Sequence, residues 1–338
     1  MPILRATTAA LKNSKKVKII AETILSIFAI FVIFIISLLA SLAKEVEVPH
    51  FINLPKGSAK SIIAFLDNQN FNVTKFDPFI LRFLGHAQSG LIEIKSKNGV
   101  LTRLDFLHAI TKAKAATTNI TLIPGETSEI FLRQVAQKLN LNLTILREEF
   151  FSRANEGELA PQTYNVALGF SEAELVEFLL NRSNAIRAEL KNSVDDAAWQ
   201  RALVVASIVQ KEAADESEFG IVSGVVYNRL AKNMPLQMDG TLNYGNYSHE
   251  RVTPQRIAQD NSEFNTYKRV GLPPLPVCNP SNEAIYAALN PTKSNYLYFV
   301  RDLRTGKHSF SATYNSHKEN INQNNRYKRQ KSNLKEAK

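Results

Sequence analysis

The carboxylate best suited to acid–base chemistry is that of Glu212, in the segment LVVASIVQKEAADESE (203–218). On a helical period of 3.6 residues it shares a face with Val205, Ile208 and Val209. An apolar, partly desolvated environment raises the pKa of a carboxyl group, which then stays protonated near neutral pH as a general acid must. Taken alone, the residues favour a plainer interpretation, in which Glu212 emerges into water at the helix end, because charged side chains are mostly exposed.

Chemistry based on a metal, a cofactor or a thiol is not indicated. His308 and His317 belong to no HExxH or clustered ligand spacing, and Cys278 is the only cysteine. The sequence contains no GxGxxG, P-loop or GxSxG pattern. We therefore expect no metal site, no disulfide within the chain and no cofactor.

The elements that position these residues begin with a long apolar run near the N-terminus. Residues 23–43 hold no charged side chain, and at about 1.5 Å per residue they reach roughly 30 Å, the thickness of the hydrocarbon layer of a bilayer. We therefore predict a transmembrane helix over 19–43. Five basic residues precede the run, so the positive-inside rule places segment 1–18 in the cytoplasm and the following chain outside. A signal peptide cleaved after Ala43 is the alternative, but its apolar region is usually only about 7–15 residues long, which favours an uncleaved anchor.

The net charge of the 338-residue chain is +10, and its two ends contribute part of that excess. Basic side chains dominate residues 323–338, a pattern typical of a solvated, disordered tail. Nucleic-acid binding would require a basic stripe with interleaved aromatic residues on a folded face, and a cytoplasmic location. We therefore expect no nucleic-acid partner, and interpret the charge as attraction to acidic cell-wall polymer or anionic lipid.

Between the anchor and the tail, the chain has the length and composition of two folding units of the α+β class. Residues 48–118 combine strand-like segments such as GLIEIK (90–95) with helical patterns over 61–68 and 101–112. This combination predicts a small α/β module.

Residues 119–322 are predicted to form a larger mixed α/β domain, with helices over about 171–190 and 194–214. Gly, Pro and Asn become frequent between 233 and 283, which indicates long loops. Because long loops retained by a compact domain tend to carry function, we expect the substrate cleft there.

The segment 206–245 resembles the motif of the YceG-like endolytic murein transglycosylases. That family shows ASI-V/I-x-KE, an S-E pair, a helix ending in NRL and then LQ-x-D-x-T-x-x-YG. The matching residues of this chain are Lys211-Glu212, Ser217-Glu218, Asn228-Arg229-Leu230, Leu236-Gln237, Asp239, Thr241 and Tyr244-Gly245. Further segments resemble other motifs of the family: IPGE (123–126), EGELAPQTY (156–164), FNTYKRVGLPPLPVCNPS (264–281) and YLYFVRDLRTGKHSFSATYNSH (296–317). The likeness runs over nearly all of 48–320, and implies a LysM-like module over 48–118 and a YceG-like catalytic domain over 119–322.

Three positions depart from the family pattern. Gln210 stands where the family commonly has a first glutamate, but the catalytic glutamate corresponds to the second position, Glu212. Gly240 replaces the usual proline of LQ-x-D-P-T, and Leu275 replaces the glycine of GLPPGP. We expect these two loop changes to alter the shape of the cleft and not its chemistry.

The resemblance implies cleavage of the MurNAc–GlcNAc β-1,4 bond in nascent peptidoglycan strands, leaving 1,6-anhydro-MurNAc ends. Glycosidases generally need two carboxylates. Here one is sufficient, because Glu212 protonates the glycosidic oxygen and then accepts the proton of the sugar's own C6 hydroxyl, an intramolecular nucleophile. We assign substrate binding to Gln237 with Asp239 and to Asn265 with Tyr267, since residues two apart in an extended segment point to the same side. The alternative is that these side chains satisfy backbone groups in long loops.

The same resemblance implies a lyase that terminates glycan elongation. It is expected in the bacterial inner membrane, single-pass, with the catalytic domain in the periplasm. Its expected partners are glycan strands, the membrane and peptidoglycan synthases (penicillin-binding proteins). Two other functions remain open: a catalytically silent wall-binding scaffold, and a hydrolytic muramidase in which Asp239 serves as the base beside Glu212.

Overall fold

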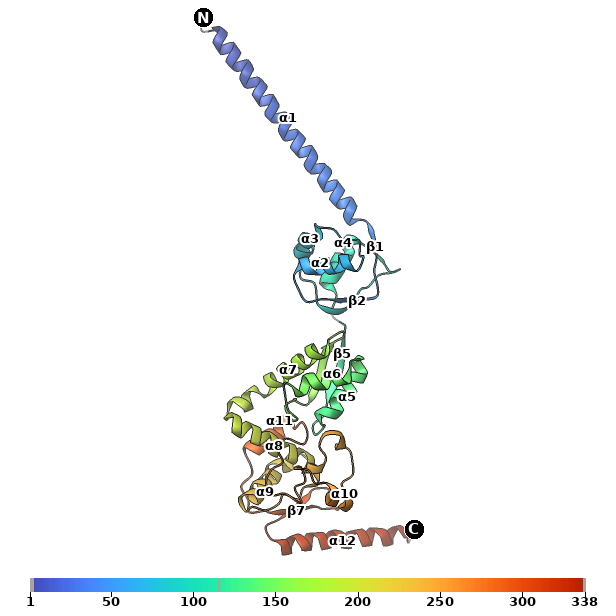
Figure 1. Cartoon of the computed structure of the whole chain (residues 1–338), viewed down its shortest axis with the longest axis vertical. Coiled ribbons are helices and arrows are strands. Elements are labelled where there is room, and N and C mark those ends of the chain that lie inside the picture. Colours follow the sequence, from blue (N-terminus) through green and yellow to red (C-terminus); the bar gives the residue numbers. More distant parts are fainter. Residues whose placement is uncertain (1–2, 115, 337–338) are drawn as a thin grey trace. The chain divides into compact units, whose positions relative to one another are not determined.

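The computed structural model describes the backbone of residues 3–114 and 116–336 and the side chains of 22–114 and 116–333. The chain folds into two compact units (Figure 1). The first unit comprises the residues up to Thr117 together with Ala167–Gly169. The second comprises Thr118–Val166 and the residues from Phe170 onward. The mixed α+β class predicted from the sequence is confirmed.

The N-terminal apolar run is part of one long helix, α1 (Ile3–Leu42). Its portion Glu22–Leu42 has a mean hydropathy of 2.9 and is long and apolar enough to cross a membrane. Most of its large apolar side chains are exposed, while Leu42 at its end is buried. The expected cytoplasmic segment, 1–18, is described only in part: residues 1–2 and the side chains of the whole segment lie outside the described residues.

The first unit continues as a small α/β module. Strands β1 (Glu45–Glu47) and β4 (Val100–Thr102) pair antiparallel, as do β2 (Phe51–Leu54) and β3 (Gly90–Glu93). Helices α2 (Ala59–Asn68) and α4 (Arg103–Lys112) lie where the sequence predicted them. Helix α3 (Asp77–Leu84) was not predicted; it packs on α2 and α4 and buries Leu81 in the module's core.

A buried ion pair links the parts of this module. Arg103 Nε lies 3.5 Å from Asp77 Oδ2, and both side chains are almost fully buried. Arg103 Nη2 also donates to Ser41 Oγ at 2.9 Å, and the Arg103 backbone N–H donates to Lys44 O. Because Ser41 and Leu42 belong to the last turn of α1, the end of that helix is held against α3 and α4.

The second unit begins with two strands, three helices and their core. Strand β5 (Thr117–Leu122) pairs with β6 (Gln162–Ala167), and α5 (Ser128–Leu139), α6 (Leu143–Phe151) and α7 (Glu172–Asn192) pack around them. Helix α7 starts at a capping box, in which Ser171 and Glu174 satisfy each other's backbone N–H groups.

A second core in this unit surrounds α8 (Asp196–Glu212), which packs against α9 (Phe219–Ala231) and α11 (Asn282–Leu289). The loops beside it contain η1 (Glu216–Glu218), η2 (Asp239–Leu242), η3 (Gly245–Tyr247) and α10 (Pro254–Gln259). The antiparallel pair β7 (Tyr298–Arg301) and β8 (His308–Ser311) follows, and then α12 (Tyr314–Glu336).

Helix α12 differs from the disordered tail expected over 323–338. The structure continues as helix to Glu336, while residues 337–338 lie outside the described part. The segment contains no Gly or Pro and is rich in Lys, Arg and Gln, which are good helix formers. Asn324 also anchors it by donating to Arg301 O and accepting from Leu303 N.

Candidate active site

Helix α8 carries Glu212 as its last residue. The residue before the helix, Asp195, caps its N-terminus, since its Oδ1 accepts a hydrogen bond from Ala198 N at 2.8 Å, and every residue from Ala202 to Val209 is buried. The burial extends beyond the single apolar stripe expected from the sequence, because α9 and α11 cover different sides of α8. A helix held in this way fixes the place where its terminal carboxylate emerges.

The Glu212 side chain is partly buried and bound to the backbone of a neighbouring loop. Its Oε1 accepts a hydrogen bond from Gly240 N at 2.6 Å. Burial raises the pKa of Glu212 to about 7; the Gly240 N–H and the Arg229 charge oppose this rise, and the negative charge of Asp239 adds to it. The sequence-based alternative, a carboxylate simply emerging into water, is therefore not what the structure shows.

Gly240 allows the loop to approach Glu212 this closely. A Cβ at position 240 would lie 2.6 Å from Lys211 Cβ and 2.9 Å from Glu212 Oε1, closer than real side chains pack. From the sequence this substitution is expected to alter the shape of the cleft and not its chemistry; the structure also places the Gly240 backbone on the Glu212 carboxylate. Gly240 supplies an N–H to the carboxylate, which proline could not do.

Asp239 and Tyr267 meet next to Glu212. Tyr267 OH donates to Asp239 Oδ1 at 2.6 Å. Burial, the hydrogen bond to Asp239 and the negative charges of Asp239 and Glu212 all raise the pKa of Tyr267, so its hydroxyl keeps its proton. The loop that carries Asp239 and the loop that carries Tyr267 are thus joined beside the Glu212 carboxylate.

Gln237 is exposed near the same loop but does not have the extended geometry that was expected. Its φ is +49°, in the left-handed region, and Asp239 two residues later begins the turn η2. The argument that residues 237 and 239 point the same way in an extended segment was therefore wrong. The backbone N–H of Gln237 donates to Thr266 O at 3.1 Å and joins its loop to the one that carries Tyr267.

Asn265 is fully buried, and its side chain is used within its own loop. Nδ2 donates to Ile257 O and to Asp260 O, each at 2.8 Å, and Oδ1 accepts from Tyr267 N at 3.1 Å. These bonds use both N–H donors of the amide and one of the two acceptor sites of its oxygen. The geometry favours the alternative role for Asn265, which is to hold the loop in shape for Tyr267.

Arg229, which the sequence marks only as part of the NRL motif, is a further member of the site. From α9 its Nη1 donates to Leu236 O at 2.6 Å and to Pro235 O at 3.1 Å, and its Nε donates to Leu297 O at 2.6 Å. These bonds fix the start of the loop that leads to Asp239 and Gly240. Its charge also lowers the pKa of Glu212.

Glu218, which had no assigned role, ties the segment after α8 to β8. His308 Nδ1 lies 2.7 Å from Glu218 Oε2, His308 N donates to Glu218 Oε1 at 2.7 Å, and Ala214 N donates to Glu218 Oε2 at 3.0 Å. Burial acts to raise the pKa of Glu218, but these hydrogen bonds outweigh it and lower the pKa. The Glu218 carboxylate thus stays charged, and it holds the backbone at Ala214, two residues after Glu212.

A second carboxyl group with a raised pKa, that of Glu156, was also missed. Burial raises its pKa to about 7, although Ser128 N, Ser128 Oγ and Gly157 N donate to it. Asn279 Nδ2 donates to the same carboxylate at 3.0 Å, and Asn279 N donates to Glu126 O. The segments IPGE, EGELAPQTY and PPLPVCNP therefore meet in one hydrogen-bonded network, and Glu156 binds chain segments together.

Gln210 also belongs to the framework of the site. Its Oε1 accepts a hydrogen bond from Ser281 N at 3.0 Å. A neutral amide is sufficient for this bond, so the Gln210 side chain has a structural contact in the framework of the site.

A cavity of about 420 Å³ is lined in part by residues 244–247, which follow Asp239 in the chain. Tyr244 stacks on Phe264 in its wall, with ring centroids 4.3 Å apart, and Leu275 and Glu156 also line it. Leu275, one of the departures from the family pattern, is therefore part of the wall of this cavity.

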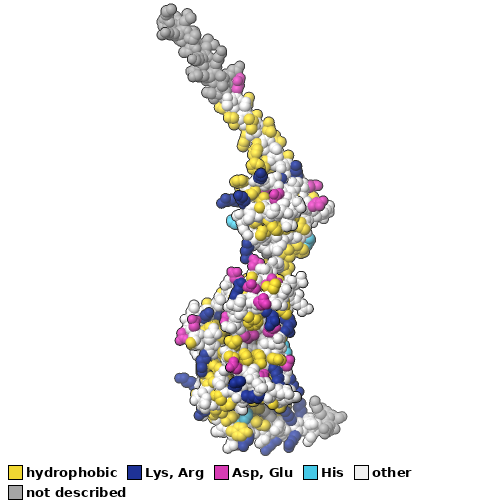
Figure 2. All heavy atoms as spheres, in the orientation of Figure 1, with side chains coloured by type: hydrophobic (Ala, Val, Ile, Leu, Met, Phe, Trp, Pro, Cys, Tyr) yellow, Lys and Arg dark blue, Asp and Glu magenta, His cyan; other side chains and the backbone are white. Residues whose placement is uncertain are grey.

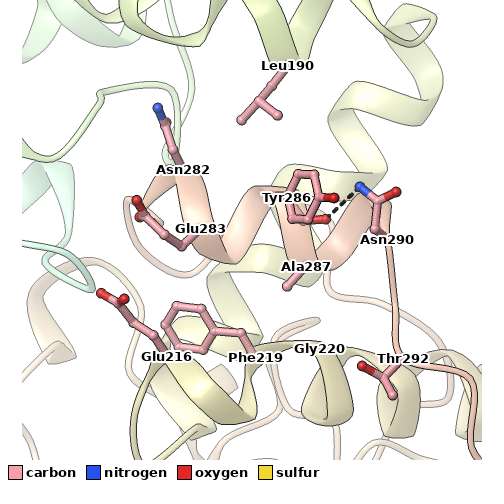
Figure 3. A pocket seen from close by; sticks show the side chains of 10 residues that line it. All are labelled: Leu190, Glu216, Phe219, Gly220, Asn282, Glu283, Tyr286, Ala287, Asn290 and Thr292. Carbon is pink, nitrogen blue, oxygen red and sulfur yellow. Dashed lines mark hydrogen bonds between the residues drawn. The ribbon is translucent and has the colours of Figure 1, made fainter.

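Another cavity in the same unit, of about 560 Å³, has a different lining (Figure 3). Phe219 and Ala287 contribute apolar surface, and the exposed Glu216 and Glu283 lie at its side. None of the predicted site residues lines it.

Several known proteins are similar to this chain. The model of the YceG-like family matches residues 52–323. The endolytic murein transglycosylase of Bacillus subtilis is 27% identical over 297 residues, which cover 79% of this chain and 82% of that protein. The endolytic murein transglycosylase of Streptococcus pneumoniae serotype 2 is 32% identical over 173 residues, 49% of this chain but only 31% of that longer protein. The crystal structure of a putative YceG-like protein from Listeria monocytogenes matches the fold with a TM-score of 0.54 and 23% identity, covering 82% of this chain and 99% of that one.

Proposed function

This chain belongs to the YceG-like family, and on that premise we propose that it is an endolytic murein transglycosylase with Glu212 as its catalytic acid and base. The relatives in Bacillus and Streptococcus carry that name. The observation that carries the assignment of the residue is the environment of Glu212, which raises its pKa to about 7. A carboxyl group with such a pKa can both donate and accept a proton near neutral pH.

The reaction starts from protonated Glu212. Its proton goes to the oxygen of the MurNAc–GlcNAc bond, the C1–O bond breaks, and positive charge develops at C1. The ionised Glu212 then takes the proton of the C6 hydroxyl as that oxygen bonds to C1, closing the 1,6-anhydro ring and restoring the acid. No water is consumed, and the attack is intramolecular.

Gly240 and Arg229 support the ionised stage of this cycle. The Gly240 N–H already points at Glu212 Oε1, and a donor in place before the reaction stabilises negative charge without reorganisation. The Arg229 charge favours the same ionised form. Burial favours the protonated form, so the two stages are close in free energy near pH 7.

Substrate binding is proposed for Asp239, Tyr267 and Gln237, with Asn265 acting through the loop that it holds. The Tyr267–Asp239 pair offers a ring face and a carboxylate beside Glu212. The cavity walled by Tyr244 and Phe264 would take a neighbouring sugar, since rings of this kind stack on apolar sugar faces.

The remaining parts of the proposal concern the whole chain. Residues 19–43 anchor it in the bacterial inner membrane with 1–18 in the cytoplasm, 48–118 form a LysM-like module, and 119–322 form the periplasmic catalytic domain. The anchor keeps the enzyme at the surface where glycan strands are polymerised. Release of strand ends there would terminate elongation next to peptidoglycan synthases.

Digestion of purified, uncrosslinked glycan strands with the full chain tests the reaction. Mass analysis should find anhydro-MurNAc ends with wild type and none with Glu212→Gln. The matched control is Glu216→Gln, the same change at an exposed carboxylate on the loop after α8, which should cleave like wild type. Reducing ends instead of anhydro ends would show hydrolysis and would favour the muramidase alternative, in which Asp239 serves as the base. No cleavage by wild type would leave a wall-binding scaffold.

A further inference from the structure

Helix α3 and its N-cap residue, Phe76, present a row of phenylalanine side chains to the outside of the first unit. Phe76, Phe79 and Phe83 are 54%, 74% and 92% exposed. Their spacing of three and four residues puts them on one face of the helix. The opposite face buries Leu81. Three exposed phenylalanines on one short helix form an apolar patch of the kind that marks an interaction surface.

This patch continues the apolar surface of α1. Phe76 contacts Phe34 edge to face, with ring centroids 6.0 Å apart. Phe34 lies eight residues before Leu42 at the end of α1, which is about 12 Å along a helix. If α1 spans the membrane, a residue that touches Phe34 lies at the depth of lipid. Figure 2 shows the hydrophobic side chains that cover the described part of α1.

Polar interactions hold α3 in this position. Asp77, the only acidic residue of α3, is buried against Arg103, which also donates to Ser41 in the last turn of α1. The pairing removes the acidic side chain from the outer face of α3.

The charges beside the patch are basic. A cavity of about 770 Å³ beside α2 and α3 is lined by residues that include Phe79 and the basic side chains of Lys60, Lys75, Arg82 and His86. No acidic residue is among the described residues that line it. Phenylalanines flanked by Lys and Arg are the composition of helices that lie in the membrane interface, where the basic groups meet lipid phosphates.

We propose that α3 is a second membrane contact of this protein, with the Phe76, Phe79 and Phe83 side chains inserted into the outer leaflet and Lys75 and Arg82 on anionic headgroups. The contact rests on α1 spanning the bilayer and is independent of the transglycosylase reaction. It would add a second point of attachment to the one that the module already has through the end of α1.

The test uses the full chain in nanodiscs that hold one copy each, made of phosphatidylcholine with a minor share of phosphatidylglycerol. Phe83→Cys is labelled with a fluorophore, and quenching by nitroxide-labelled lipid is measured. The matched control is Phe51→Cys, an exposed phenylalanine on β2 of the same module. Cys278 is fully buried, so the native fold shields it from the label.

Lipid quenching should be severalfold stronger at position 83 than at position 51, and weaker at 83 in discs of phosphatidylcholine alone. Phe79→Cys should repeat the result and guards against a folding defect at one position. Equal quenching at 83 and 51 would overturn the proposal. Quenching at 83 that does not depend on phosphatidylglycerol would overturn the part played by Lys75 and Arg82.

Discussion

The acid–base role proposed for Glu212 combines two requirements that normally oppose each other. A general acid must hold its proton near neutral pH, whereas a general base must give a stable carboxylate. In this protein burial favours the first state, and the Gly240 N–H with the Arg229 charge favours the second. The hydrogen bond at 2.6 Å is therefore as much a part of the proposed chemistry as the apolar helix that delivers the residue.

The raised pKa of Glu212 predicts a stability change with a definite sign. In the unfolded chain the carboxyl has its ordinary pKa of 4.5; in the folded protein its pKa is about 7, so between these values the folded state binds more protons. Stability therefore falls as pH rises through this window. Glu212→Gln cannot ionise and keeps an acceptor for Gly240, so it should gain roughly 1–3 kcal/mol over wild type between about pH 4 and pH 8.

Urea unfolding of the detergent-solubilised full chain at both pH values measures this difference. Glu216→Gln, the same change at an exposed position, is the control. A Glu212→Gln variant that differs from wild type by the same amount at both pH values would contradict a raised pKa.

Gly240→Ala should lower activity at least about tenfold, since the added Cβ lies within contact of Lys211 Cβ and Glu212 Oε1 and must displace the carboxylate. The measurement is the rate of anhydro-MurNAc release under saturating glycan. Gly271→Ala is a suitable comparison, because no atom lies within 4 Å of a Cβ there, although its φ of +98° makes it strained. Activity retained by Gly240→Ala would mean that the loop is free to move away from Glu212.

At the scale of elements, the end of α8 is positioned from two sides. The loop that carries Gly240 is fixed by Arg229 on α9, and the chain after Glu212 is fixed by Glu218 and His308 on β8. Neither Glu218 nor His308 is placed in contact with substrate. They act on the proposed reaction through the position of the helix end.

His308→Ala should therefore lower kcat about tenfold while KM stays within about twofold, because the helix end loosens and the binding loops do not. His308→Asn should recover most of the rate, since its amide can donate to Glu218 in place of Nδ1. Steady-state kinetics on purified glycan strands separate the two constants. Equal losses in His308→Ala and His308→Asn would indicate a role for the imidazole itself.

At the scale of the whole molecule, the end of α1 belongs to the module that follows it. Leu42 is buried, and Ser41 accepts a hydrogen bond from Arg103. Cleavage after Ala43 would remove both residues and leave Arg103 with Asp77 as its remaining side-chain partner in a buried site. This packing gives a structural reason to expect an uncleaved anchor, beyond the length of the apolar run.

Intact-mass measurement of the protein purified from membranes should accordingly give the full chain including α1. Alkaline carbonate extraction should leave it in the membrane fraction. A mass corresponding to a chain that starts at Lys44, released by carbonate, would instead identify residues 1–43 as a signal peptide.

The sequence by itself determined the features that depend on neighbouring residues. The apolar run, helices α2, α4, α7 and α8, and the position of Glu212 on an apolar face could all be predicted from periodicity, and the family could be identified from its motifs. These features follow from local spacing, because a helix repeats every 3.6 residues whatever surrounds it.

Only the tertiary structure decided how separate segments meet. It joined Gly240 to Glu212 and Tyr267 to Asp239, and it turned Asn265 inward to hold its own loop. No local pattern predicts such contacts, since the partners of the first two pairs are 28 residues apart and their geometry comes from loops. The pKa of Glu212 depends on these contacts and on its burial, and so its proposed role as both acid and base is a property of the fold.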